Sequence, residues 1–218
     1  MTADTNPGQA KMAKAPRITF GPVSCCIYCG KEGDLRTEHI IPFGLGGNLE
    51  LLKGSCADCG TTTSRFEMIC LRETFNNLRV KYGVQTRRPE RRKRAFPIWV
   101  ERLDGTSIEE AIGPEELPLH GWALPLLDTP SFASQIAPDN RTVLQCQLET
   151  GDAEAALAHG DGHSPVSINL GRVDLQSFAR MLAKIAHSYA YAILPKGSFQ
   201  PCLNKLILEG DEGSLLSG

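Results

Sequence analysis

The sequence predicts an α+β fold, and three of its features lead to that prediction. Two Cys-x-x-Cys pairs lie in the first 60 residues, short segments rich in β-branched residues follow in the middle of the chain, and one long stretch near the end has the period of an amphipathic helix. With 218 residues, of which 41% are hydrophobic, the chain can bury a core of its own. We therefore expect a small metal-stapled module followed by a mixed α/β region.

The first sixteen residues are small and polar, with two prolines and no hydrophobic period. A segment of this composition buries too little apolar surface to offset the entropy of ordering it, so we expect a disordered tail at residues 1–16. It also lacks the apolar stretch of a secretory signal, and no run in the chain approaches the roughly 18 apolar residues that a membrane span requires. These observations favour a cytoplasmic protein without a membrane partner.

The eight cysteines fit either a disulfide framework or a metal site. In the reducing cytoplasm paired thiols more often hold metal, and Cys26/Cys29 and Cys56/Cys59 have the two-residue gap that lets one tight turn aim both sulfurs at one ion. Cys25 lacks that gap. We predict a four-cysteine zinc site, with buried free thiols as the alternative. Such a zinc ion would be structural, because four thiolates leave no open position for water or substrate.

The segment between the cysteine pairs carries two further motifs, Glu38-His39-Ile40-Ile41-Pro42 and Gly46-Gly47-Asn48. Together with the cysteine pairs, and in this order, they resemble the zinc-containing branch of the HNH endonuclease family. The resemblance covers residues 20–82, under a third of the chain. It implies a ββα-metal fold in residues 17–82, in which a hairpin and the following helix hold a divalent cation against the scissile phosphate.

The resemblance also implies a role for each matched residue. His39 would be the general base that takes a proton from the attacking water, since imidazole titrates near neutrality. Glu38 would bind the catalytic Mg²⁺ or Mn²⁺ through its carboxylate, and Asn48 would steady the hairpin and help to orient the base. The implied activity is that of a metal-dependent endonuclease, a hydrolase of phosphodiester bonds, with DNA as the expected substrate.

One position departs from the family's pattern. Family members usually carry His or Asn directly after the second Cys-x-x-Cys pair, where it completes the catalytic metal site, but this chain has Gly60 followed by Thr61, Thr62 and Thr63. A threonine hydroxyl, a water molecule or Glu67 could take that place. Two interpretations stay open: a slow nuclease, or a catalytically weakened zinc module that binds nucleic acid or a protein partner without cleaving it.

Charge is divided unevenly along the chain. Residues 1–100 hold 16 Lys and Arg against 9 Asp and Glu, a net of +7, whereas the remaining 118 hold 7 against 16, a net of −9. A basic half favours a polyanionic partner such as nucleic acid, because clustered cations neutralise phosphates. The alternative for the basic linker at residues 83–95 is a solvated segment that binds nothing. The expected phosphate-binding residues are Arg65, Arg87, Arg88, Arg91, Arg92, Lys93 and Arg94.

The rest of the chain predicts mixed secondary structure. Residues 63–82 have a helical period, and residues 96–103, 142–148 and 166–170 have the composition of strands. Residues 174–194 predict a long helix that Asp174 caps and Pro195 ends. We expect its apolar stripe to pack on the strands, within a C-terminal α+β region at residues 96–218 whose role is not indicated, and which could hold a protein partner or a second copy. The stripe consists of Leu175, Phe178, Leu182, Ile185, Tyr189 and Ile193.

Overall fold

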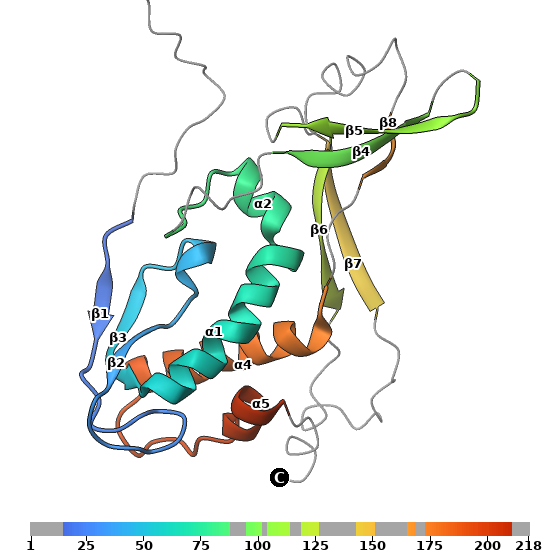
Figure 1. Cartoon of the computed structure of the whole chain (residues 1–218). Coiled ribbons are helices and arrows are strands. Elements are labelled where there is room, and N and C mark those ends of the chain that lie inside the picture. Colours follow the sequence, from blue (N-terminus) through green and yellow to red (C-terminus); the bar gives the residue numbers. More distant parts are fainter. Residues whose placement is uncertain are drawn as a thin grey trace, which may run out of the picture. The chain divides into compact units, whose positions relative to one another are not determined.

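The structure, a computed structural model of the 218-residue chain, describes residues 15–87, 95–101, 104–113, 119–126, 143–150, 165–168 and 173–210. It mixes helices and strands, which confirms the α+β class (Figure 1). The chain divides into two compact units: residues 1–73, 82–92 and 174–218 form the first, and residues 74–81 and 93–173 form the second. We expected residues 174–218 to continue the region that begins at residue 96, but they group with the N-terminal residues. Most of the expected tail, residues 1–14, lies outside the described residues.

The first unit contains a sheet with the strand order β1-β3-β2. Strand β1 (Ile18–Phe20) runs parallel to β3 (Leu49–Ser55), and β2 (Arg36–His39) runs antiparallel to it. The register sets His39 opposite Glu50 and Glu38 opposite Leu51, with a bulge just before Glu38. Gly54 makes room for this arrangement, because a Cβ there would lie only 2.7 Å from the Cβ of Glu38. A short 3-10 helix, η1 (Phe43–Leu45), lies between β2 and β3.

Helix α1 (Ala57–Ile69) follows β3 directly, with Cys56 as its N-cap residue. The helix expected at residues 63–82 therefore begins earlier, and it is also interrupted: a π-helical turn, η2 (Cys70–Thr74), separates α1 from α2 (Asn76–Lys81). The early start follows from the second cysteine pair, because a helical turn between Cys56 and Cys59 brings both sulfurs to one side. The buried side of α1 carries Cys59, Thr63 and Phe66, at helical spacing.

Helix α4 (Leu175–Ile193) confirms the long helix predicted from the sequence. Asp174 caps it by accepting a hydrogen bond of 2.7 Å from the backbone amide of Ser177, and the helix ends before Pro195. Its apolar stripe was expected to pack on the strands of the middle region; within the first unit, α4 contacts α1 (Figure 1), α5 (Asn204–Glu209) and β3. Arg180 joins α4 to α5 by donating to the carbonyl oxygens of Ile207 and Leu208.

The buried face of α4 is not the predicted apolar stripe. Leu175, Leu182, Tyr189 and Ile193 are exposed, and Phe178 is the stripe residue that is buried. The face turned inward is partly polar, and three of its polar side chains have partners within the first unit: Lys184 pairs with two carboxylates, His187 contacts the carbonyl of Ile27, and Ser188 donates to the carbonyl of Lys184. Polar contacts, which a hydrophobic period does not reveal, therefore set the rotation of this helix. The buried residues include Ser177, Phe178, Met181, Lys184, His187 and Ser188.

The described residues of the second unit form two antiparallel sheets. In one, β4 (Phe96–Glu101) lies between β5 (Ser107–Ile112) and β8 (Pro165–Ile168), and in the other β6 (Leu119–Leu126) pairs with β7 (Val143–Thr150). Strands β4, β7 and β8 overlap the three predicted segments, whereas β5 and β6 were not predicted. A small hydrophobic core joins α2 to the β5-β4-β8 sheet and consists of Val80, Phe96, Ile98 and Ile112. None of the described helices is long and apolar enough to cross a membrane.

Candidate functional site

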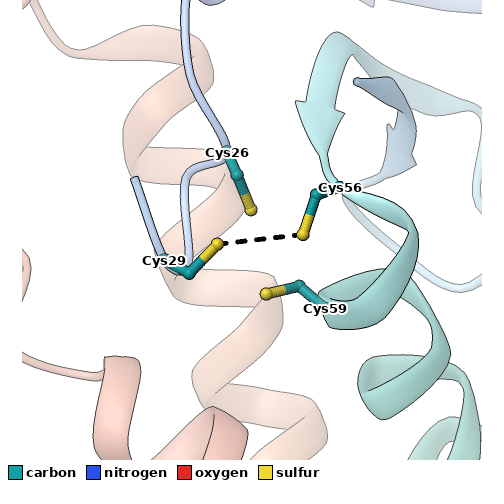
Figure 2. Close-up of side chains that lie close together, drawn as sticks. All are labelled: Cys26, Cys29, Cys56 and Cys59. Atoms are coloured by element: carbon teal, nitrogen blue, oxygen red, sulfur yellow. Dashed lines mark hydrogen bonds between the residues drawn. The ribbon is translucent and has the colours of Figure 1, made fainter. Parts of the chain in front are cut away.

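Four cysteine sulfurs converge in the first unit (Figure 2). Cys26 and Cys29 lie in a tight turn closed by a 2.9 Å hydrogen bond from the amide of Gly30 to the carbonyl of Cys26, while Cys56 and Cys59 lie at the start of α1. All four sulfurs lie within 4.8 Å of one another, and those of Cys29 and Cys56 are 3.8 Å apart. Tetrahedral zinc with Zn–S bonds of about 2.3 Å requires sulfurs about 3.8 Å apart. The four thiols therefore fit one structural metal ion such as zinc.

The electrostatics of the cysteine cluster bear on how metal binds. Burial acts to raise the pKa of Cys56, but the backbone amide of Cys59 and the neighbouring thiols outweigh it and lower this pKa to about 7. The pKa of Cys59 is raised instead, mainly by burial. Metal binds to thiolates, so Cys59 must lose its proton as the ion enters.

The first cysteine pair is anchored to the core of the unit by the two residues between its cysteines. The amide of Ile27 donates to the carbonyl of Gly54 at 2.9 Å, and His187 Nε2 on α4 lies 2.8 Å from the carbonyl oxygen of Ile27. The ring of Tyr28 stacks on that of His187 at 5.5 Å between centroids. Metal binding at the cysteines is thereby coupled to the packing of β3 and α4.

His39 ends β2 and lies between two charged side chains. Its Nε2 is 2.9 Å from Arg87 Nη2, and its Nδ1 is 3.6 Å from Glu50 Oε1 on the neighbouring strand β3. Burial lowers the pKa of His39 from its ordinary value of 6.5, and Arg87 and Lys184 lower it further against the opposing charge of Glu50. The imidazole is therefore neutral at physiological pH.

The neighbours of His39 assign the position of its proton. A guanidinium can only donate hydrogen bonds, so Nε2 accepts from Arg87 and the ring proton belongs on Nδ1, which faces Glu50. Nδ1 is buried, and at 3.6 Å Glu50 acts on it by charge without a hydrogen bond. A neutral imidazole with its lone pair on Nε2 and a carboxylate behind Nδ1 is the state that a general base requires.

The resemblance implied that Asn48 steadies the hairpin and helps to orient His39, and the structure shows which residues lie at these two places. The side-chain amide of Asn48 donates a 2.7 Å hydrogen bond to the carbonyl of Pro16, so it ties the chain before β1 to the start of β3. The group beside the His39 ring is Glu50, which is buried and also pairs with Arg17 at 3.4 Å. Glu50 was missed in the sequence because its role depends on the register of β2 against β3.

Glu38 and Glu67 come together around a residue that the sequence did not single out. Lys184 of α4 is fully buried, and its Nζ lies 2.8 Å from Glu38 Oε1 and 2.9 Å from Glu67 Oε1. Nζ also donates to the carbonyl oxygen of His39 and lies 3.4 Å from that of Ile40. One ammonium is therefore surrounded by two carboxylates and two backbone carbonyls.

The charge of Lys184 is stabilised by these neighbours. Burial acts to lower the pKa of Lys184, but Glu38 and Glu67 outweigh it and raise this pKa above its ordinary value. Burial also raises the pKa of Glu67, against the effect of Lys184, and burial together with both carboxylates raises the pKa of the Tyr28 phenol. Lys184 thus keeps its proton throughout the physiological range and balances a buried acidic pair.

The residues that the resemblance implies for a catalytic Mg²⁺ or Mn²⁺ do not fit such an ion in this structure. The ammonium of Lys184 fills the space between the carboxylates of Glu38 and Glu67. Gly60 brings no ligand, and the hydroxyls of Thr61, Thr62 and Thr63 donate to backbone carbonyls of α1. The oxygen atoms expected to bind a divalent cation are thus engaged in other interactions.

Two of the predicted phosphate-binding residues are described. Arg87 lies beside His39, with its guanidinium carbon 5.8 Å from the centroid of the Phe43 ring, and Arg65 is exposed on α1. The structure thus brings Arg87 to the candidate base. The remainder of the predicted group, Arg88, Arg91, Arg92, Lys93 and Arg94, lies outside the described residues.

Searches of protein-family models, of curated proteins and of solved structures found no match to this chain. Two chemical features stand out among the described residues. The first is a cysteine cluster suited to a structural metal. The second is a neutral histidine placed between a carboxylate and an arginine.

Proposed function

We propose that this chain is a zinc-stapled endonuclease of the HNH type that hydrolyses phosphodiester bonds of nucleic acid, with DNA as the expected substrate. The observation that carries the proposal is the state of His39, which is neutral, has its lone pair on Nε2, and lies between Glu50 and Arg87. General bases in hydrolases need a proton acceptor of this kind near a cation that can hold the substrate anion.

The order of elements supports the same proposal. Strands β2 and β3 pair antiparallel, α1 follows β3 directly, and the cysteine cluster joins the turn before β2 to the start of α1. This is the succession that a ββα-metal module requires. The strand that carries His39 is thus fixed by its pairing with β3, and a metal ion bound by the four cysteines would fix the turn before it.

The proposed reaction uses residues that the structure brings together. An incoming phosphodiester draws the guanidinium of Arg87 away from His39 and onto a phosphate oxygen, which frees Nε2 for a water molecule. As the water oxygen attacks phosphorus, its proton passes to Nε2 and the bond from phosphorus to the leaving oxygen breaks. The charge of Glu50 stabilises the imidazolium that forms, and that imidazolium returns its proton to the leaving oxygen or to solvent.

A second candidate is a zinc module that binds nucleic acid without cutting it. The observation in its favour is Lys184, because an ammonium between Glu38 and Glu67 occupies the position implied for the catalytic cation. In that case Arg65 and Arg87 would contact phosphates, and His39 would only pack beside Arg87.

Incubation of zinc-loaded protein with plasmid DNA, single-stranded DNA and RNA separates the two candidates, with fluorescence anisotropy measured on the same substrates. The proposal expects one class of substrate to be bound and cleaved. Binding without cleavage of any substrate would favour the second candidate. Absence of both binding and cleavage would reject both.

The cleavage rate is expected to fall at acid pH. His39 must be unprotonated to act as a base, and its pKa is lowered from 6.5, so the rate should rise with pH up to a midpoint below 6.5 and then level off. Single-turnover rates between about pH 4.5 and 8 measure this, with zinc content followed at each pH because acid also protonates thiolates. A midpoint above pH 7 would contradict the assignment of His39.

Reversing the charge of Arg87 is expected to weaken nucleic-acid binding for every sequence tested. Removal of one phosphate contact should also reduce the salt slope, d log K/d log[salt], by roughly 1. Lys196→Glu is the matched control, because Lys196 is exposed in the turn after α4. Equal losses of affinity in the two variants would show that the effect comes from net charge alone. An unchanged salt slope in Arg87→Glu would show that Arg87 does not contact phosphate.

A further inference from the structure

We propose that Lys184 is the resident cation of this site: its ammonium takes the place between Glu38 and Glu67 that the resemblance gives to a divalent ion, so that no second metal is needed beside the one at the cysteines. The proposal deepens the proposed function and rests on it for the reaction, whereas its statement about cation binding can be tested without cleavage.

The geometry around Lys184 Nζ is that of a cation site. Two carboxylate oxygens lie at 2.8 and 2.9 Å, the carbonyl of His39 accepts a further hydrogen bond, and the carbonyl of Ile40 lies at 3.4 Å. Such a cluster of oxygens suits Mg²⁺, Mn²⁺ or Ca²⁺ when no ammonium is present. The buried lysine and a divalent ion therefore compete for the same oxygens.

The connection to His39 gives Lys184 a positioning role. Lys184 is fully buried, so it does not reach a substrate phosphate, but it binds the backbone of His39 and the side chain of Glu38 next to it. It thereby holds the end of β2 on which the imidazole is mounted. A divalent ion bound between the two carboxylates would hold the same elements.

The same proposal accounts for Gly60. A catalytic metal site needs a ligand from the start of the helix, whereas an ammonium delivered from α4 completes the charge balance without one. Space does not explain the glycine, because a Cβ at residue 60 would meet only the Ser55 hydroxyl, at an ordinary 3.5 Å. Once the cation comes from Lys184, a side-chain donor at residue 60 has no ion to bind.

The test measures Mn²⁺ binding by the loss of the free Mn²⁺ signal in electron paramagnetic resonance, on protein whose zinc content is monitored. Wild-type protein is expected to leave the signal unchanged. Lys184→Ala is expected to bind one equivalent of Mn²⁺, and its lowered melting temperature should rise with Mn²⁺ concentration. Lys184→Ala/Glu67→Gln should lose most of that binding, because one carboxylate is gone.

Arg180→Ala is the matched control. Arg180 lies one turn before Lys184 on α4, and its loss removes hydrogen bonds to α5 without opening the acidic pair. This variant should be destabilised but should gain no Mn²⁺ site. A gain equal to that of Lys184→Ala would show that loosening of α4 is the cause, and would overturn the proposal.

A variant without charges keeps the proposal testable if Lys184→Ala folds poorly. Glu38→Gln/Glu67→Gln/Lys184→Met is expected to retain zinc, to fold, and to show no response to Mn²⁺. The proposal is overturned if wild-type protein binds an equivalent of Mn²⁺ or requires it for cleavage, if folded Lys184→Ala binds none, or if the variant without charges binds it. Cleavage that requires Mn²⁺ would leave the proposed nuclease standing, whereas a wild-type protein inert on nucleic acid would leave the statement about cations standing.

Discussion

Replacement of Cys59 by serine is expected to empty the metal site and unfold the first unit. The four sulfurs hold the turn before β2 against the start of α1, and His187 of α4 packs on the same turn through Ile27 and Tyr28. Apparent free energies of zinc binding to small zinc domains are about 10–16 kcal/mol, which is as large as the whole unfolding free energy of a typical domain, about 5–15 kcal/mol. Zinc content by elemental analysis and helicity by circular dichroism should fall together.

Cys202→Ser is the control for this prediction, because Cys202 is exposed and lies outside the cluster. It should keep its zinc and its melting temperature. Chelation of zinc from wild-type protein should reproduce the effect of Cys59→Ser. Wild-type protein that is well folded and contains no zinc would contradict the role given to the cysteines.

Replacement of His39 by alanine is expected to reduce the cleavage rate by about 10²–10⁴-fold, the usual contribution of a positioned general base. Zinc content and affinity for nucleic acid should change little, because His39 is not part of the cysteine cluster and the proposal gives phosphate binding to arginines. Single-turnover rates at saturating protein separate the chemical step from binding.

Glu50→Gln provides a second test at the same site. The charge of Glu50 raises the pKa of His39, so the variant should move the acid limb of the rate profile to lower pH and reduce the rate less than His39→Ala does. A His39→Ala protein that cleaves as fast as wild type would remove His39 from the mechanism. A Glu50→Gln profile identical to that of wild type would remove Glu50 from it.

The cysteine cluster could be predicted from the sequence because its information is local. Each two-residue gap specifies one turn, and the two turns need only be brought to the same ion. The choice of Cys26 over Cys25 follows from the same spacing and is confirmed. The long helix at Leu175–Ile193 was equally accessible, since its cap at Asp174 and its end before Pro195 depend on neighbouring residues.

Lys184 could not be predicted in the same way, because its contacts join residues 145 positions apart. The hydrophobic period of α4 pointed to a face with Leu182 and Tyr189, but the ion pairs with Glu38 and Glu67 turn another face inward. Glu50 is a milder case, since its place beside His39 follows from the pairing of β2 with β3 once the register is known. A buried charge is stable only with its partners, and a single sequence does not show which partners meet.

Rescue of the His39→Ala variant by free imidazole tests the central claim most directly. The side chain of His39 is 22% exposed, so a small base can reach the space it leaves. The measurement is the cleavage rate of a fluorescent nucleic-acid substrate by zinc-loaded wild type and His39→Ala, with and without imidazole. We predict that imidazole restores a measurable part of the rate in His39→Ala, increasingly as pH rises through the pKa of imidazole, and does not accelerate wild type. Cleavage by His39→Ala at the wild-type rate without imidazole, or a wild-type protein that binds nucleic acid and never cleaves it, would contradict the claim.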